Sequence, residues 1–253
     1  MSYPDSFSLL ITGGGSGIGA GAARYFCEQG AKVTICGRRS HKIQEVVESA
    51  GPLCHGVVAD ITLAEDRRRL VKEAAEFGGG LSGLINNAGN MYRSPLEGVS
   101  EDQLLQLFHT NVVAGMMLTQ SALPYLKESR GSILFLGSVH NKRAFPGASP
   151  YAATKGALDA LTKSLAAELG GHGVRVNCLV PGAVASEINQ RAGLFTEEEA
   201  QERFRSLGSL HALGRIGTVE EVAQAMESLL LGQWTTGASM TVDGGLSLGL
   251  TNH

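Results

Sequence analysis

Short apolar segments alternate with longer amphipathic segments along nearly the whole chain of 253 residues. Short apolar runs are typical of buried strands, and the amphipathic stretches have helical spacing. Seven strands are predicted, at 8–11, 32–36, 56–59, 83–85, 132–136, 175–180 and 238–242. Strand–helix alternation with short connections favours a parallel sheet covered by helices on both faces. The prediction is therefore an α/β fold: a single doubly wound, Rossmann-like domain over 1–253 with a seven-stranded parallel sheet.

The helices between these strands carry recognisable start signals. Three starts have capping-box spacing, in which a Ser or Thr precedes a Glu or Gln by three residues: Thr62 with Glu65, Ser100 with Gln103, and Thr218 with Glu221. Ser149-Pro150 predicts a fourth start, and Pro124 is expected to kink or end the helix after Ser100. Residues 186–217 interrupt the alternation and include a predicted helix at 196–206. A long excursion after a strand is where a substrate lid would lie.

Composition excludes several classes of partner. The formal net charge of −3 argues against nucleic acid, and no apolar stretch approaches the 18 residues of a membrane span. The N-terminus has no secretory pattern, so a cytoplasmic location is expected. No His, Asp or Glu spacing indicates a catalytic metal. None of the four cysteines, Cys27, Cys36, Cys54 and Cys178, has C-x-x-C spacing, which argues against a zinc or thioredoxin-type site. Cys36 and Cys178 lie in predicted strands and are interpreted as buried reduced thiols.

A glycine-rich segment, Thr12-Gly-Gly-Gly-Ser-Gly-Ile-Gly19, follows the first strand and opens a helix. Glycines allow a tight turn and a close approach of the backbone to a ligand. The helix N-terminus offers unpaired N–H groups and a positive dipole end, which suit a pyrophosphate. The alternative is a turn without a ligand, and the strand–turn–helix context favours the nucleotide interpretation.

Polar residues also follow the next strands, where an open parallel sheet binds ligands. Asp60 could accept a hydrogen bond from an adenine amino group or cap the next helix, a role that Thr62 fills better. Asn87 could contact a cofactor or tie adjacent strand ends together. Arg38 and Arg39 stand where an acidic residue would hold a ribose 2′-hydroxyl and where an arginine accepts a 2′-phosphate.

These two arginines favour NADP(H) over NAD(H). The alternative is a solvated basic helix start, which is the interpretation given to Arg67-Arg68-Arg69 on the next helix.

Tyr151-x-x-x-Lys155 places a phenol and an ammonium on one face of a predicted helix. The ammonium should lower the pKa of the phenol, which could then act as a general acid–base. Ser138 ends the fifth strand and could polarise a substrate carbonyl. Asn111 lies within a predicted helix, where a water relay to Lys155 would give it partners. His140 is interpreted as an exposed loop histidine and His109 as a surface or packing residue.

These motifs together resemble the short-chain dehydrogenase/reductase family, and in particular its NADP(H)-dependent 3-oxoacyl-reductase-like members. The resemblance runs from about Ser8 to Gly245 and includes the glycine turn, Asn86-Asn87-Ala88-Gly89, Asn111, Ser138, Tyr151-x-x-x-Lys155, Pro181-Gly182 and Asp243-Gly244-Gly245. It implies that Tyr151 exchanges the proton and Ser138 orients the substrate oxygen. Lys155 would bind the nicotinamide ribose and lower the pKa of Tyr151. Asn111 would hold a water molecule in the proton relay.

The residue patterns and the resemblance together predict the cofactor-binding set: Gly13, Gly15, Ser16, Gly17, Ile18, Gly19, Arg38, Arg39, Asp60, Ile61, Asn87, Ala88, Gly89, Tyr151, Lys155, Pro181, Gly182, Val184 and Ser186. Ser186 stands where the family usually has Thr, and a hydroxyl remains. Ser16 stands where many NADPH-using members have a basic residue, so the NADP(H) prediction depends on Arg38, with Arg39 as a helper.

The expected activity is hydride transfer between NADP(H) and a carbonyl or secondary alcohol. The alternatives are an NAD(H)-dependent alcohol dehydrogenase and a non-catalytic nucleotide sensor on the same fold. A mostly apolar substrate pocket is expected, with Met91, Tyr92, Phe145 and Phe195 as candidate lining residues. The resemblance also implies a homo-oligomer, most often a tetramer.

Overall fold

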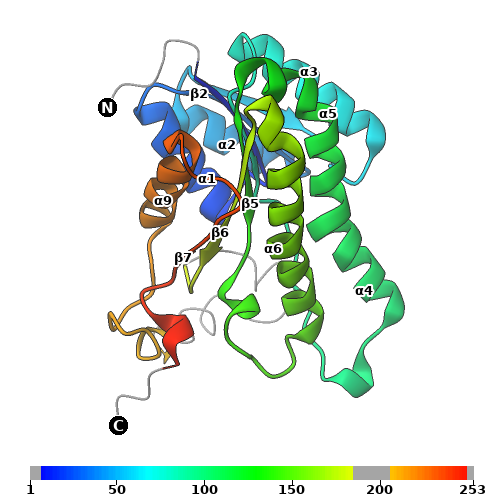
Figure 1. Ribbon diagram of the computed structural model, residues 1–253, viewed down its shortest axis with the longest axis vertical. Helices are drawn as coiled ribbons and strands as arrows, with labels where there is room; N and C mark the ends of the chain where they lie inside the picture. Colours follow the sequence, from blue (N-terminus) through cyan, green and yellow to red (C-terminus); the bar gives the residue numbers. More distant parts are fainter. Residues whose placement is uncertain (1–6, 185–205, 250–253) are drawn as a thin grey trace.

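The protein folds around one parallel sheet of seven strands (Figure 1). The structure is a computed structural model that describes residues 7–184 and 206–249. The strands are β1 (Ser8–Thr12), β2 (Lys32–Gly37), β3 (Cys54–Val58), β4 (Gly83–Asn86), β5 (Ser132–Leu136), β6 (Arg175–Pro181) and β7 (Ser239–Val242). Their order is β3-β2-β1-β4-β5-β6-β7, and every neighbouring pair is parallel. The predicted doubly wound α/β fold is confirmed.

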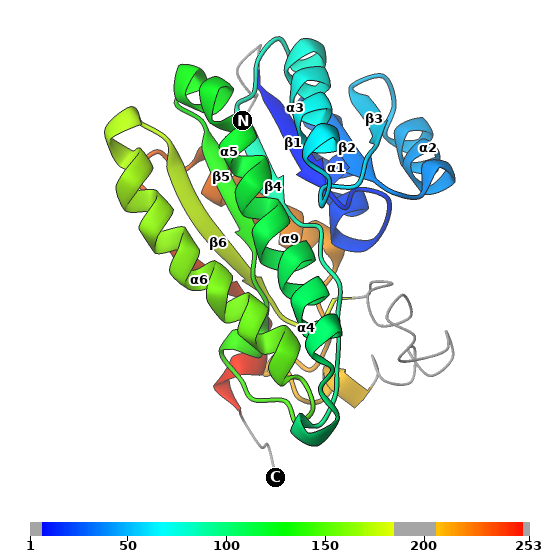
Figure 2. The same ribbon diagram turned by 90° about the vertical axis from the view of Figure 1, so that its right-hand side faces the viewer.

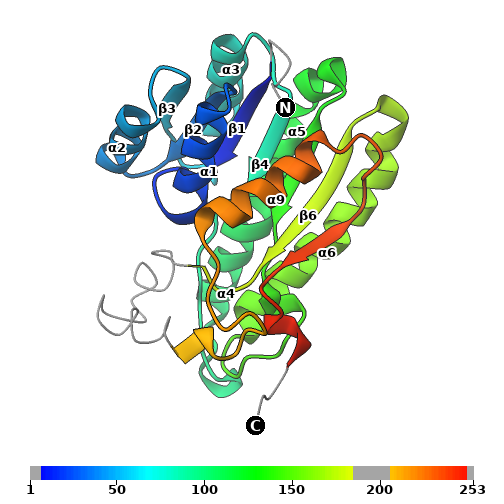
Figure 3. The same cartoon turned by 90° about the vertical axis from the view of Figure 1, so that its left-hand side faces the viewer.

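Helices cover both faces of the sheet. One face carries α3 (Ala64–Gly78), α4 (Glu101–Phe108), α5 (Ala114–Ser129) and α6 (Ser149–Leu169), which stand in front of the strands in Figure 2. The opposite face carries α1 (Gly17–Glu28), α2 (Ser40–Ala50) and α9 (Val219–Leu231), as Figure 3 shows. Each covering layer has its own hydrophobic core.

Consecutive strand residues point to these two cores in turn. Leu9 and Ile11 of β1 pack with α1 and α9, whereas Leu10 between them packs with α3, α5 and α6. All three side chains are at most 1% exposed. Because both faces are buried, β1 is a continuous apolar run without polar alternation. The fold therefore explains why the strands appear in the sequence as short uninterrupted apolar segments.

The winding of the sheet changes direction between β1 and β4, which are neighbours although β2 and β3 intervene in the sequence. The connections from β1 and β4 leave toward opposite faces, which opens a crevice at the carboxyl ends of the strands. The glycine-rich turn follows β1, and the segment that contains Asn87 follows β4. The topology thus positions the predicted site residues at one edge of the sheet.

Two helix starts agree with the predicted caps and one does not. Thr218 and Glu221 form the full capping box, and Ser100 Oγ accepts from Gln103 N. The box predicted for Thr62 and Glu65 is wrong, because α3 begins at Ala64 after Leu63, which makes no side-chain cap. Thr62 Oγ1 instead donates to Asp60 Oδ1 over 2.7 Å. Asp60 Oδ1 also accepts from Thr62 N, so these two residues form a turn before α3 begins.

Other predictions concern helix ends, cysteines and membrane spans. Helix α5 continues past Pro124 to Ser129, and α6 begins at Ser149 with Ala148 rather than Ser149 as its N-cap. Cys36 and Cys178 are buried free thiols, as predicted, and Cys27 and Cys54 are buried free thiols too. Within 7–184 and 206–249, no helix has the length and apolarity needed to cross a membrane. The helix predicted at 196–206 lies, except for its last residue, outside the described residues.

Candidate active site

A cavity of about 470 Å³ opens at the carboxyl ends of β1, β2, β3 and β4. Most of the predicted cofactor-binding set lines it: Gly13, Gly15, Ser16, Gly17, Ile18, Arg38, Arg39, Asp60, Ile61, Asn87, Ala88 and Gly89. Its lining also includes residues that the sequence analysis did not assign to cofactor binding: Cys36, Gly37, Ile43, Ala59, Thr62, Asn90, Met91 and Thr110. The sequence pattern therefore predicted the position of this cavity, but it identified only some of the residues that line it.

The glycine turn after β1 is required by the protein's own packing as well as by any ligand. Gly13 has φ +67° and Gly17 has φ +53°, values that residues with a side chain rarely adopt. A Cβ on Gly19 would lie 2.5 Å from both Gly13 O and Asn87 Nδ2. Gly19 is thus required by the protein's own packing, and it does not line the described cavity.

The start of α1 suits an anionic ligand. Ser16 is the N-cap but makes no side-chain capping bond, and the first turn contains no acidic residue. The first-turn N–H groups can therefore bind phosphate oxygens, with the positive end of the helix dipole behind them. Together with the cavity, this arrangement fits the pyrophosphate of a dinucleotide.

The two arginines after β2 border the same cavity. Arg39 Nη2 donates to Ser16 Oγ over 3.1 Å, which links the end of β2 to the start of α1. The Arg38 side chain is 65% exposed, and its Nη1 lies 3.8 Å from Asp60 Oδ2. An ion pair this long and exposed is weak. Both guanidinium groups can therefore turn toward a phosphate at this edge, and their donor geometry fits a 2′-phosphate.

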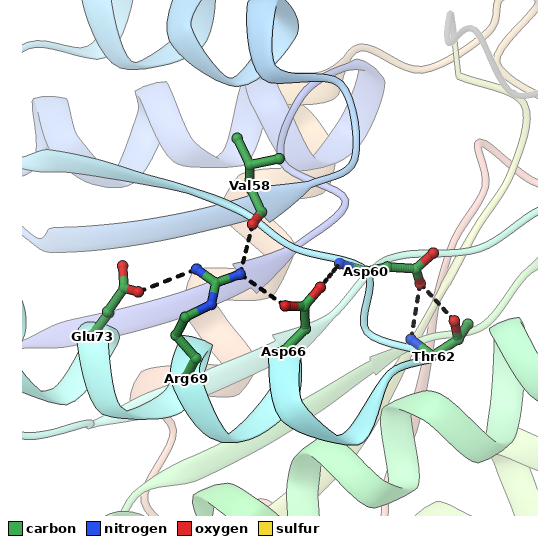
Figure 4. Close-up of polar contacts among 6 residues, drawn as sticks. All are labelled: Val58, Asp60, Thr62, Asp66, Arg69 and Glu73. Atoms are coloured by element: carbon green, nitrogen blue, oxygen red, sulfur yellow. Dashed lines mark hydrogen bonds and ion pairs between the residues drawn. The ribbon is translucent and has the colours of Figure 1, made fainter.

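Asp60 is held by a network on α3 rather than acting as a free acceptor (Figure 4). Its Oδ1 accepts from Thr62 N and Thr62 Oγ1, at 3.0 and 2.7 Å. Its backbone N–H donates to Asp66 Oδ2 over 2.7 Å. This bond, with a further one from Arg69, lowers the pKa of Asp66. The remaining oxygen of Asp60 faces Arg38, so the carboxylate is positioned at the cavity edge from both sides.

The basic triplet of α3 has a structural function that the sequence analysis missed. Arg69 donates to Val58 O at the end of β3 over 2.8 Å and pairs with Asp66 and Glu73 (Figure 4). Arg67 is only 9% exposed and donates to Ile61 O over 2.7 Å. The prediction of a solvated basic helix start is therefore wrong for Arg67, because the carbonyl of Ile61 needs a donor. Arg69 is exposed, as predicted, although it also bonds the end of β3. Arg68 is exposed, as predicted.

Asn87 ties the ends of β1 and β4 together. Its Nδ2 donates to Thr12 O over 2.8 Å, and its backbone N–H donates to Thr12 Oγ1 over 3.0 Å. Thr12 Oγ1 also accepts from Ala88 N. Asn87 still lines the cavity, so the two alternatives proposed for it, tie and ligand contact, are compatible.

The predicted acid–base residues come together beside this cavity. Ser138 follows β5, and the side chains of Tyr151 and Lys155 lie on the first turns of α6. Tyr151 and Lys155 are each 5% exposed. Lys155 Nζ donates to Leu136 O over 2.6 Å and lies 5.5 Å from the centroid of the Tyr151 ring. A phenol, a hydroxyl and an ammonium thus converge at the carboxyl end of β5, where they can exchange a proton with a ligand oxygen.

The electrostatics of this group differ from the prediction made for Tyr151. Burial raises the pKa of Tyr151 to about 12, and a hydrogen bond from Ser138 opposes this shift. Burial also lowers the pKa of Lys155 to about 8. The expected lowering of the Tyr151 pKa by Lys155 is not found in the protein alone, because burial dominates the pKa of Tyr151 and Lys155 is not among the groups that shift it. In the protein without a ligand, Tyr151 is therefore a neutral phenol at neutral pH.

Asn111 has direct partners that the sequence analysis did not foresee. It lies in a π-helical turn, His109–Val113, between α4 and α5. Its Nδ2 donates to Asn90 O and Thr154 Oγ1, at 2.9 and 3.1 Å, and its Oδ1 accepts from Asn90 N. Asn111 therefore has protein partners for its amide nitrogen and for its amide oxygen. Thr154 could have been predicted as a site residue from its position three residues after Tyr151, on the same helical face.

His140 also lies in this group, and the prediction of an exposed loop histidine is wrong. Its Nδ1 is 3.0 Å from Ser138 Oγ. Its ring contacts the Tyr151 ring edge-on, with centroids 5.1 Å apart, and packs on Phe145 at 4.4 Å. The packing on Phe145 and Tyr151 partly buries the imidazole. This packing cannot be recognised from the sequence. The sequence feature that could have indicated this position is that His140 follows Ser138 by two residues.

The remaining predicted residues lie apart from the described cavity. Pro181 ends β6, and a Cβ on Gly182 would lie 2.7 Å from Asp243 Cα, so this glycine allows close packing of β7. Val184 forms an isolated bridge with Gly217. Ser186 and Phe195 lie outside the described residues. Tyr92 accepts at its hydroxyl from Ser100 N, which gives it a structural role.

Comparison with known proteins places this geometry among oxidoreductases. The sequence profile of a family described as enoyl-(acyl carrier protein) reductase matches residues 13–247. L-fucose dehydrogenase of Bos taurus is 37% identical over 245 residues, which are 95% of this chain and 89% of that protein. Gluconate 5-dehydrogenase of Gluconobacter oxydans is 35% identical, with 99% of this chain and 100% of that protein covered.

A solved structure agrees over the same extent. A short-chain dehydrogenase/reductase of unknown function from Caenorhabditis elegans, crystallised with cofactor, superimposes with a TM-score of 0.90 and 29% identity. The match covers 97% of each chain. The similarity in sequence and in structure thus extends over both the cavity and the acid–base group.

Proposed function

The chain belongs to the short-chain dehydrogenase/reductase family, and from this premise we propose that it is an NADP(H)-dependent oxidoreductase that interconverts a carbonyl compound and a secondary alcohol. The observation that carries the proposal is the meeting of Ser138, Tyr151 and Lys155 beside a cavity bordered by Arg38 and Arg39. Acid–base chemistry and binding of a phosphorylated nucleotide are thereby combined at one edge of the sheet.

The cofactor residues divide into two functions. The N–H groups at the start of α1 would hold the pyrophosphate, and Asp60 would accept a hydrogen bond from the adenine. Arg38 and Arg39 would hold the 2′-phosphate that distinguishes NADP(H) from NAD(H). The cofactor would supply hydride transfer to a carbonyl carbon, or from an alcohol carbon in the reverse direction.

Side chains of this protein supply the accompanying proton transfer. Tyr151, neutral because its pKa is raised to about 12, donates its hydroxyl proton to the substrate oxygen as that oxygen gains negative charge. Ser138 donates a hydrogen bond to the same oxygen and fixes its position. Lys155, 5.5 Å from the centroid of the phenol ring, stabilises the phenolate that remains. In alcohol oxidation the same proton returns to Tyr151.

The test is a titration of the purified protein with NADPH and separately with NADH, followed by turnover measurements. L-fucose and gluconate are the first substrates, because two similar proteins are named for them. Ketones and an enoyl thioester complete the panel. Tighter binding of NADPH and reduction of a ketone support the proposal, whereas tighter binding of NADH favours the NAD(H) alternative. Tight cofactor binding without turnover of any substrate would indicate a nucleotide sensor.

A homo-oligomer is part of the same proposal, by analogy with the family. Light scattering of the purified protein measures the assembly directly. A mass of about 26.5 kDa at micromolar concentration, the mass of one chain, would contradict it.

A further inference from the structure

His140 is in contact with Ser138, the residue proposed to orient the substrate oxygen. His140 Nδ1 is 3.0 Å from Ser138 Oγ, and the His140 backbone N–H points to the same oxygen at 3.4 Å. Ser138 Oγ also hydrogen-bonds the phenol of Tyr151, whose pKa it lowers. The Ser138 hydroxyl is therefore shared by an imidazole on one side and the proton-exchanging phenol on the other.

A count of protons shows why the imidazole matters. A serine hydroxyl has one proton to donate and can accept two hydrogen bonds. If Nδ1 carries no proton, Ser138 donates to Nδ1 and has no proton left for the phenolate or the substrate oxygen. If Nδ1 carries a proton, His140 donates to Ser138, and the Ser138 proton can point only toward Tyr151 and the substrate. The tautomer of His140 thus determines whether the Ser138 proton is available to the phenolate or to the substrate oxygen.

We propose that His140 is a positioning residue for the reaction, which donates its Nδ1–H to Ser138 Oγ and thereby directs the Ser138 proton toward the substrate oxygen. This inference rests on the proposed function and adds a residue to it.

The surrounding residues hold the imidazole in this place. Its ring packs on Phe145 at 4.4 Å and meets the edge of Tyr151 at 5.1 Å. Arg143 lies 5.9 Å from the Phe145 ring and donates to Leu246 O over 2.8 Å, which ties the loop to the C-terminal turn. His140 lies in the short helical turn Val139–Asn141, which follows β5. The strand end, the loop and α6 therefore fix its ring together. Such support is what a positioning residue requires.

The kinetic test compares two substitutions of His140. His140→Phe keeps the aromatic packing and removes the donor, so kcat is expected to fall about tenfold or more, with little change in KM and in NADPH affinity. His140→Asn places an amide N–H near the position of Nδ1 and should restore most of kcat. His172→Phe is the matched control, because that histidine is exposed in another loop, and it should leave kcat unchanged.

A second background separates positioning from general disturbance. In Ser138→Ala, His140→Phe should have no further effect on kcat, because its hydrogen-bond partner is gone. An equal loss in both backgrounds, a wild-type kcat in His140→Phe, or failure of His140→Asn to restore activity overturns the inference.

A spectroscopic measurement decides the inference without any turnover. In protein labelled with ¹⁵N-histidine, the imidazole shifts of His140 report which nitrogen carries the proton. At pH 8 we expect a protonated Nδ1 in the wild-type protein and a changed Nδ1 signal in Ser138→Ala. An unprotonated Nδ1 in the wild-type protein contradicts the inference. If no substrate is turned over, the proposed function fails, and this measurement still tests the role of His140.

Discussion

The nucleotide end of the crevice, at the carboxyl ends of β1 to β3, and the catalytic end, at β5 and α6, are built from different chemistry. The nucleotide end relies on backbone: glycines with positive φ, helix N–H groups and two partly exposed arginines. The catalytic end relies on the side chains of Ser138, Tyr151 and Lys155, the last two only 5% exposed. Backbone sites are sensitive to an added Cβ, whereas side-chain sites are sensitive to the loss of one polar atom.

Burial explains the second contrast between these ends. Charges at the nucleotide end are close to solvent, and their ion pairs, such as Arg38 with Asp60 at 3.8 Å, are weak and exchangeable. At the catalytic end burial raises the pKa of Tyr151 to about 12 and lowers that of Lys155 to about 8. An exchangeable charge suits a ligand that must leave, and a desolvated group suits proton transfer. Each of the following predictions tests one side of this comparison.

The largest effect is expected at the catalytic end from loss of one oxygen atom. Tyr151→Phe should lower kcat by about 10²–10⁴-fold, the usual contribution of a general acid–base. NADPH affinity should change little, because the cavity lining at the nucleotide end is untouched. Steady-state kinetics and NADPH titration measure both quantities. Tyr125→Phe on α5 is the control, and substantial turnover by Tyr151→Phe would reassign the proton donor.

The next effect is expected at the nucleotide end from gain of one carbon atom. Gly19→Ala places a Cβ 2.5 Å from Gly13 O and Asn87 Nδ2. Relief of this overlap should cost about 1–3 kcal/mol of unfolding free energy and weaken NADPH binding. Gly156→Ala is the matched control, because no atom lies within 4 Å of its added Cβ, and it should stabilise α6. Equal stability of the two variants would contradict the packing argument.

A smaller effect is expected on cofactor preference. Arg38→Asp removes a phosphate donor and adds a charge that repels phosphate, so the ratio of NADPH to NADH affinity should fall by about 10- to 150-fold. Titration with both cofactors measures this ratio. Arg68→Asp, on the exposed side of α3, should leave it unchanged. An unaltered preference in Arg38→Asp would move the selection to other residues.

The smallest effect is a pH dependence of stability from Lys155. Its folded pKa of about 8 lies below the ordinary 10.5. Between these values the unfolded chain binds a proton that the folded protein does not, so raising the pH stabilises the fold. From pH 7 to 9.5 the unfolding free energy of the wild type should rise by about 2 kcal/mol relative to Lys155→Met. Urea denaturation at several pH values measures this difference, and a constant difference would show that Lys155 is not desolvated.

Much of the fold could be predicted because its signals are local. Seven apolar runs match β1 to β7 within a few residues, and the Thr218 cap was foreseen in full. The Thr62 cap was wrong because α3 begins two residues later, at Ala64, after a turn in which Asp60 accepts from Thr62 N and Oγ1. Both outcomes depend on hydrogen bonds made over a few residues.

The site was predicted in part for the same reason. The glycine turn, Arg38 and Tyr151-x-x-x-Lys155 are recognisable from spacing alone. The contacts of His140, Arg67 and Asn111 were not recognisable, because their partners lie on other elements or depend on how a loop folds.

The amino-acid sequence by itself determined the strand–helix alternation, the backbone freedom at the glycine turn, and which side chains share a face of α6. These are properties of neighbouring residues, so they exist before the chain folds. Only the tertiary structure decided the pKa directions of Tyr151 and Lys155 and the placing of His140 against Ser138. Desolvation and hydrogen bonding between separate elements depend on what surrounds a group in space, and that environment arises only when the sheet and its helices assemble.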